Sequence, residues 1–164
     1  MEWLEKTLGF ALVLSWWQQL GLAFLLGSFA VATLSDLKYL SAQREFREVW
    51  LLFIFGVLVF EFYDLYAGTL DPTKFVVKWG LIALLSLLFH RWVGILSSLA
   101  FGDVAALAAA ASLLTPVLIV IFYAIVKLIT WIAEHTLLKN RPYWPFMPVV
   151  SLATLAVLIL GLLL

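Results

Sequence analysis

Cysteine is absent from this chain of 164 residues, and charged residues make up only 12% of it. Without cysteine the protein has no disulfide, no thiol nucleophile and no cysteine metal site. The two histidines lie far apart in the sequence, which argues against a zinc site. An ordinary soluble domain carries about 25% charged residues. The composition therefore excludes a soluble enzyme, a disordered chain and a disulfide scaffold.

An excess of either charge is also missing, since ten Lys and Arg balance ten Asp and Glu. This balance provides neither a basic surface for nucleic acid nor an acidic tail. Hydrophobic residues make up 65% of the chain. We therefore expect an all-α, polytopic helical membrane protein with a single membrane-embedded domain over residues 1–164. Residues 1–17 are interpreted as an interfacial lead-in or an extension of the first helix.

Apolar segments suited to crossing a membrane recur along the whole chain. A transmembrane helix needs roughly 20 mostly apolar residues to cross about 30 Å of hydrocarbon. The pattern predicts six spans: Leu20–Ser35, Val49–Ala67, Phe75–Phe89, Val104–Thr115, Pro116–Ala133 and Val149–Leu164. The fourth is short, because the stretch from Asp103 to Thr115 rises only about 20 Å. We therefore expect Asp103 to lie in a recess about 10 Å deep, with the stretch 92–101 lining the way in.

The basic residues predict the orientation of these spans. Six of them fall in the loops after the first, third and fifth predicted spans: Lys38, Arg44, Arg47, Arg91, Lys139 and Arg141. By the positive-inside rule these loops face the cytosol. The expected location is the cytoplasmic membrane, crossed several times, with both ends of the chain outside.

Two acids are predicted to face the same side of the membrane. Asp36 closes the first predicted span, and Asp103 opens the alanine-rich fourth. Simpler interpretations exist: Asp36 as a helix-end charge at the interface, and Asp103 as an N-cap that follows a turn relaxed by Gly102. As a pair, however, two carboxylates share one proton. One then acts as general base for a water, and the other as general acid for a leaving amine. Such chemistry needs no metal and no cofactor.

Two further features of the predicted spans give expectations. Glu61 and Asp64 lie near the outer end of the second span, where we expect both to point toward the outer headgroups. The alanines that follow Asp103 make the fourth span thin. A thin helix lets a neighbouring backbone or a substrate approach closely.

Three motifs resemble one family of membrane aspartyl proteases. Ala100-Phe101-Gly102-Asp103 resembles the G-x-G-D motif of the type IV prepilin peptidase and archaeal preflagellin peptidase family. Asp36 precedes a short basic loop and another span, as the first aspartate of that family does. Pro145-Phe146-Met147-Pro148 resembles the P-F-x-P that begins the family's last helix. Ala100 stands where the motif has its first glycine, and the I-P-N after the first aspartate is missing.

The resemblance implies a peptidase-only, archaeal-type member, because the four-cysteine domain of the bacterial enzymes is absent. It implies an endopeptidase that cleaves class III signal peptides of prepilin- or archaellin-like membrane proteins at the cytosolic face. Asp36 and Asp103 would activate water, with Gly102 as a supporting motif residue. The expected partners are these substrates and membrane lipid.

Two other classes stay open at this point. A small transporter or proton-coupled protein would use the same acids as an ion relay, and a scaffold would use them only as helix caps. The sequence leaves open which pilin or archaellin is cleaved, which bond is cut, and the oligomeric state.

Overall fold

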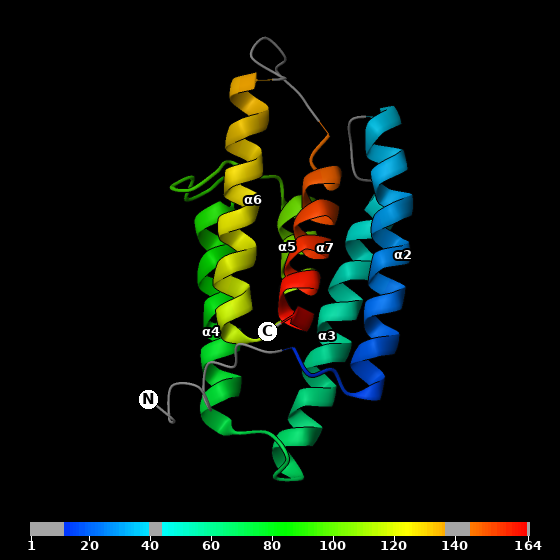
Figure 1. Cartoon of the computed structure of the whole chain (residues 1–164), viewed down its shortest axis with the longest axis vertical. Coiled ribbons are helices and arrows are strands. Elements are labelled where there is room, and N and C mark those ends of the chain that lie inside the picture. The colour runs from blue at the N-terminus through cyan, green and yellow to red at the C-terminus, as the bar shows by residue number, and fades with distance from the viewer. Residues whose placement is uncertain (1–11, 40–43, 137–144, 164) are drawn as a thin grey trace.

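The structure, a computed structural model, describes residues 12–39, 44–136 and 145–163. This part of the chain is all-helical, as predicted (Figure 1). Its helices, in chain order, are α2 (Trp16–Tyr39), α3 (Arg44–Tyr66), α4 (Pro72–Phe89), α5 (Phe101–Ala111), α6 (Pro116–Thr136) and α7 (Met147–Leu163). Each helix overlaps one of the predicted spans.

Helix length separates these elements into two groups. Helices α2, α3, α4 and α6 are long and apolar enough to cross a membrane, whereas α5 and α7 are shorter apolar helices. The chain is therefore a polytopic helical membrane protein. The prediction of six crossings depends on α5 and α7, which fall short of the length of a full span.

The outer faces of the long helices are apolar. On α2, the side chains of Leu20 and Leu34 are 65% and 70% exposed, and on α3 Phe55 is 62% exposed. Soluble monomers rarely expose contiguous apolar surface of this kind, because contact between apolar surface and water is unfavourable in free energy. Such faces fit a hydrocarbon environment, in agreement with the composition.

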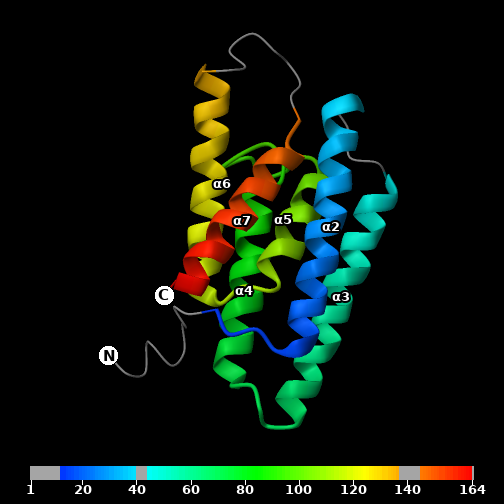
Figure 2. The ribbon, with the colours of Figure 1, turned by 45° about the vertical axis from the view of Figure 1, so that its right-hand side comes forward.

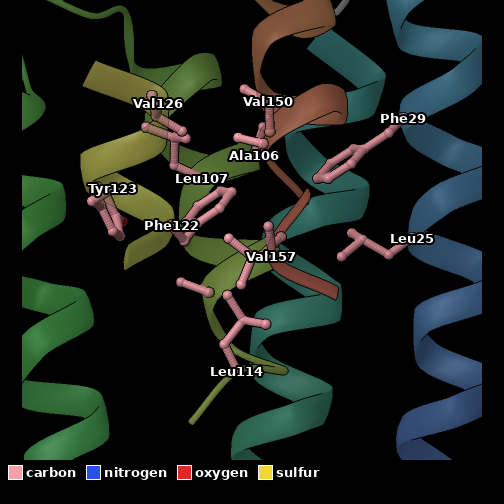
Figure 3. Close-up of a cluster of buried hydrophobic side chains, with 14 of the residues drawn as sticks. Leu25, Phe29, Ala106, Leu107, Leu114, Phe122, Tyr123, Val126, Val150 and Val157 are labelled. Carbon is pink, nitrogen blue, oxygen red and sulfur yellow. The ribbon is translucent and has the colours of Figure 1, made fainter. Parts of the chain in front are cut away.

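Helix α5 lies at the centre of the bundle, in contact with α3, α4 and α7. Figure 3 shows Ala106 and Leu107 of α5 among buried side chains of α2, α6 and α7. Ala106 and Ala109 are fully buried. The small alanine side chains thus let the protein's own helices approach closely. Of the two possibilities, approach of a neighbouring backbone or of a substrate, the structure shows the first at these buried alanines.

The segment between α4 and α5 folds back on the end of α4. Arg91 N–H donates to the carbonyl of Leu99 at 3.1 Å, and Leu99 N–H donates to the carbonyl of Phe89 at 3.0 Å. Gly94 turns the chain at φ 62°, a conformation that favours glycine. From α6, the ammonium of Lys127 donates to the carbonyl of Leu96. These bonds fix the point where α5 begins.

Helix α5 begins below the upper ends of α2 and α6 (Figures 1 and 2). The recess around Asp103 and its depth in a membrane stay predictions.

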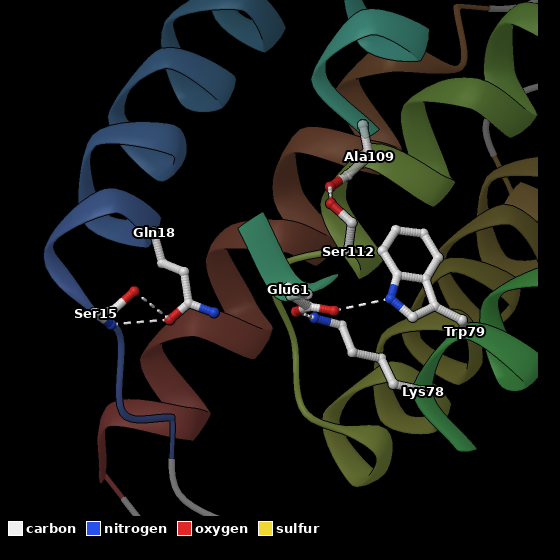
Figure 4. Close-up of polar contacts among 7 residues, drawn as sticks. All are labelled: Ser15, Gln18, Glu61, Lys78, Trp79, Ala109 and Ser112. Atoms are coloured by element: carbon white, nitrogen blue, oxygen red, sulfur yellow. Dashed lines mark hydrogen bonds and ion pairs between the residues drawn. The ribbon is translucent and has the colours of Figure 1, made fainter. Parts of the chain in front are cut away.

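A buried ion pair joins α3 to α4 near the opposite end of the bundle. Lys78 donates to Glu61 Oε1, and Trp79 Nε1 donates to Glu61 Oε2 at 2.8 Å (Figure 4). Glu61 is only 4% exposed. The expectation that Glu61 points toward the outer headgroups was therefore wrong. Sequence spacing did not reveal a partner on the next helix.

Candidate active site

Asp36 is buried between α2 and α7. Its exposed fraction is 4%, and its Oδ2 accepts the backbone N–H of Met147, the first residue of α7, at 2.9 Å. The first N–H groups of a helix lack partners within the helix, and a carboxylate there also complements the helix dipole. The side chain of Asp36 thus caps the first turn of α7, a helix that is far away in the sequence.

This position corrects one detail of the sequence interpretation. Helix α2 continues past Asp36 to Tyr39, so Asp36 does not close the helix. It lies within the last turns, on the side that meets α7. The simpler interpretation of Asp36, a helix-end charge at the interface, does not hold, because the side chain is buried in the protein.

Hydroxyl groups extend the contact between α2 and α7. Ser151 Oγ donates to the carbonyl of Met147 at 3.0 Å and lies 2.9 Å from Thr33 Oγ1. Because a hydroxyl has one hydrogen and Ser151 donates it to Met147, Thr33 is the donor in this second bond. Thr33 precedes Asp36 by about one helical turn. Two hydrogen bonds, Met147 to Asp36 and Thr33 to Ser151, therefore join α2 and α7.

Asp103 lies in the first turn of α5 rather than at its N-cap. The N-cap residue is Ala100, which has no side-chain capping bond. The Asp103 carboxyl instead forms a hydrogen bond with the backbone of Ala100. A carboxyl at the third helical position commonly reaches back in this way, as half of a capping box. The interpretation of Asp103 as the N-cap was therefore wrong, because Asp103 lies three residues after the N-cap residue Ala100.

Gly102 also lies inside α5, not in the turn before it. Positive φ angles occur at Gly68 and Gly94 among the described glycines, and not at Gly102. The idea that Gly102 relaxes the turn before the helix is therefore wrong. Its part as a supporting motif residue stays a prediction.

The fold brings Asp36 and Asp103 together. They are close enough for the negative charge of Asp36 to act on the Asp103 carboxyl. Asp103 lies outside the four helices that are long enough to span a membrane. Burial, and then the charge of Asp36, raise the pKa of Asp103 above its usual range, while the hydrogen bond with Ala100 opposes this shift. A raised pKa favours the protonated carboxyl at this position.

Side chains that the sequence interpretation did not assign to the site surround the start of α5. The guanidinium of Arg47 on α3 lies 5.9 Å from the ring centroid of Phe101, and the ring of His90 lies 6.3 Å from it. Arg47 had served only to predict orientation. Ser35, next to Asp36, has a buried hydroxyl that finds no hydrogen-bond partner within the described residues. No pattern in the sequence indicated these contacts.

The arrangement therefore consists of two acids at one end of a membrane bundle. One accepts a backbone N–H, and the other is shifted toward its protonated form. Within the described ranges, no group of three or more His, Asp or Glu is placed to hold a metal ion. Of two nearby carboxyls, one can act as general base and the other as general acid.

Fold and site together define a class of protein: a polytopic helical membrane protein with a carboxyl pair at one end of its bundle. No family model, curated protein or solved structure matches the chain. The function is therefore inferred from the site and the sequence motifs.

Proposed function

We propose that the chain is a membrane aspartyl endopeptidase that cleaves class III signal peptides of prepilin- or archaellin-like proteins. One observation carries the proposal. Asp36 and Asp103, which belong to helices far apart in the sequence, lie close enough for the charge of one to act on the other. A carboxyl pair of this kind can supply both the general base and the general acid that peptide hydrolysis by activated water requires.

The chemical roles follow from the surroundings of each acid. Asp36, which accepts the N–H of Met147, takes a proton from water, and the water oxygen attacks the scissile carbonyl carbon. Asp103, shifted toward its protonated form, gives its proton to the leaving nitrogen as the C–N bond breaks. The products are a carboxyl-terminated leader and an amine-terminated mature protein. The two acids together hold one proton before and after the reaction.

The charges around the site support cytosolic cleavage. Lys38 lies in the last turn of α2, Arg47 near the start of α3, and Arg91 just after α4, all at the end of the bundle that holds Asp36. Basic residues are enriched on the cytosolic side of membrane proteins. The substrate class itself rests on the resemblance of three motifs to the prepilin and preflagellin peptidases.

The direct test is incubation of the purified protein, in detergent, with prepilin-like proteins encoded in the same genome. A peptidase shortens at least one of them at a single site, and mass spectrometry of both products locates the bond. If the wild-type protein leaves every such substrate intact under conditions where it stays folded, the peptidase proposal is overturned.

A second candidate is a proton-coupled transporter, and the buried Glu61–Lys78 pair favours it. Ionisable residues inside a membrane bundle often belong to ion pathways. A flux assay in liposomes with a pH-sensitive dye separates the candidates. Proton flux without cleavage of prepilins supports the transporter, and cleavage without flux supports the peptidase.

A further inference from the structure

A groove runs between α2 and α7, and its lining includes Thr33 and Ser151, which lie about one helical turn from Asp36 and Met147. Its volume is about 430 Å³. Leu26, Ala30 and Leu34 of α2 and Leu155 of α7 provide most of its apolar lining, and the hydroxyls of Thr33 and Ser151 form its polar part. We call this feature the α2–α7 groove. It contains no charged lining residue.

The groove is open to the lipid side of the bundle. Leu34 is 70% exposed and Leu155 is 45% exposed, so the apolar walls face outward. In Figure 2, α7 leans away from α2 with increasing distance from its first residue. The two helices therefore separate toward the end of the bundle that lies away from Asp36.

The polar end of the groove leads to Asp36. Thr33 precedes Asp36, and Ser151 follows Met147, by about one helical turn each. Met147 is the residue whose N–H binds Asp36. An occupant that enters the groove from the lipid side therefore lies closest to Asp36, the proposed base, at the end of the groove formed by Thr33 and Ser151.

We propose that the α2–α7 groove receives the beginning of the substrate's apolar helix, an inference that rests on the proposed peptidase function. In such substrates the cleavage site directly precedes an apolar helix that stays in the membrane. A helix that lies in the groove with its N-terminal end at Thr33 places the preceding peptide bond beside Asp36.

The dimensions of the groove set how much of the helix it holds. From Leu26 to Leu34, α2 rises about 12 Å, which matches about two turns of a partner helix. Ala30 projects no more than a methyl group into this stretch. Small residues of this kind let two membrane helices approach closely.

The hydroxyls have a role at the cleavage site. Residues at a scissile bond lie outside the substrate's helix, so their N–H groups need acceptors. The oxygen of Thr33 donates its hydrogen to Ser151 and keeps lone pairs free to accept. Thr33 is thus placed to hold the extended residues between the helix and Asp36.

A second apolar groove, beside α4, fits this occupant less well. Its lining includes Arg91, His90 and Trp92. The occupant is an apolar helix, and a charged guanidinium in the lining suits such a helix poorly because its desolvation is costly. The α2–α7 groove presents no such charge in its lining.

Cross-linking tests the docking site without depending on catalysis. The native chain has no cysteine, so Leu155→Cys can be introduced alone into an Asp103→Asn background that does not cleave. The probe is an intact prepilin with one cysteine in the first two turns of its apolar helix, treated with a short bismaleimide in vesicles. We expect an adduct of enzyme and prepilin. Leu84→Cys on α4, which is 53% exposed, serves as the matched control.

Two results overturn the docking proposal. One is an adduct that forms equally at Leu84→Cys and Leu155→Cys, or only at Leu84→Cys. The other is the absence of any prepilin adduct at Leu155→Cys, including the case in which two enzyme copies or only lipid occupy the groove. Wild-type cleavage of the same prepilin is measured in parallel. Failure of the docking site alone, with cleavage intact, is thereby distinguished from failure of the peptidase proposal.

Filling the groove provides a second measurement. Ala30→Phe should raise KM for the prepilin by about tenfold or more while kcat changes little, because it removes binding and not chemistry. Ala83→Phe makes the same change in the groove beside α4 and should leave KM unchanged. Equal KM values for the two variants contradict the proposal.

Discussion

Asp36 combines a structural contact with a proposed chemical role. Its carboxyl accepts the N–H of Met147 and so holds the beginning of α7, while the same group lies near Asp103. An amide side chain still accepts this N–H, but it cannot exchange a proton. The choice of substitution therefore separates the two roles of this residue.

Asp36→Asn should abolish prepilin cleavage, by about 10³-fold or more, with little change in the thermal midpoint. Asp36→Ala should abolish cleavage and also lower the free energy of unfolding by about 1–3 kcal/mol, because Met147 N–H loses its partner. Both are measured by gel assay and thermal unfolding in detergent. Normal cleavage by a well-folded Asp36→Asn protein removes Asp36 from catalysis.

Asp103→Asn should be as inactive as Asp36→Asn, and the double variant no worse than either, because the two acids act as one unit. A multiplicative loss in the double variant contradicts this. The same cleavage assay, with expression and folding confirmed, checks all three proteins.

The pH dependence of the wild type follows from the raised pKa of Asp103. Its protonated form is the proposed acid, so cleavage should fall as the pH rises through that pKa. The free energy of unfolding should also fall as the pH rises through this pKa. A carboxyl whose folded-state pKa is raised stabilises the fold below its unfolded-state pKa, and this contribution is lost as the pH rises through the raised value.

Comparison with Asp103→Asn measures the stability part of this effect. The Asn variant does not ionise, so its thermal midpoint should gain on that of the wild type as the pH increases. A difference in midpoint that is independent of pH contradicts the burial of an ionisable Asp103. The cleavage profile should show two apparent values that belong to the pair.

At the scale of the element, α5 shows how a helix is shaped by its neighbours. Its alanines are short enough for α3, α4 and α7 to approach, and Ala106 is fully buried. Ala106→Leu should therefore overpack the bundle and cost about 1–3 kcal/mol of unfolding free energy. Ala23→Leu, at an exposed position on α2, is the control. Equal thermal midpoints for the two variants contradict the central position of α5.

The ion pair between α3 and α4 belongs to the same scale. Glu61→Leu leaves the buried ammonium of Lys78 without its charge partner and should cost about 3–5 kcal/mol. The double change to Glu61→Leu and Lys78→Met removes both charges and should restore most of that loss. Denaturation of the four proteins forms a double-mutant cycle. A double variant that is as unstable as the sum of the single changes contradicts a direct interaction.

At the scale of the whole molecule, the orientation in the membrane is the main prediction. The segment around Trp92, at the same end as Asp36, should face the cytosol, and the turn around Thr69 should face outside. Single cysteines at these two positions can be labelled with an impermeant maleimide in intact cells, because the native chain has none. Labelling of Trp92→Cys from outside, with Thr69→Cys protected, contradicts cytosolic cleavage.

The sequence by itself determined the class of the protein and the positions of its helices. Few charges and long apolar runs indicate helices in a membrane, because a helix satisfies its own backbone hydrogen bonds in hydrocarbon and needs about 20 apolar residues to cross it. The order of Asp36, the basic loop and Asp103 likewise indicated that both acids lie at one end.

Only the tertiary structure decided which side chains meet. That Asp36 holds the start of α7, that Glu61 pairs with Lys78, and that the alanines of α5 face the protein interior all depend on contacts between helices. The length of an apolar run gives the length of a membrane helix. In a chain this apolar, however, hydrophobic periodicity barely marks which face of the helix turns inward. Packing between helices sets that rotation, and with it the site and the groove that leads to it.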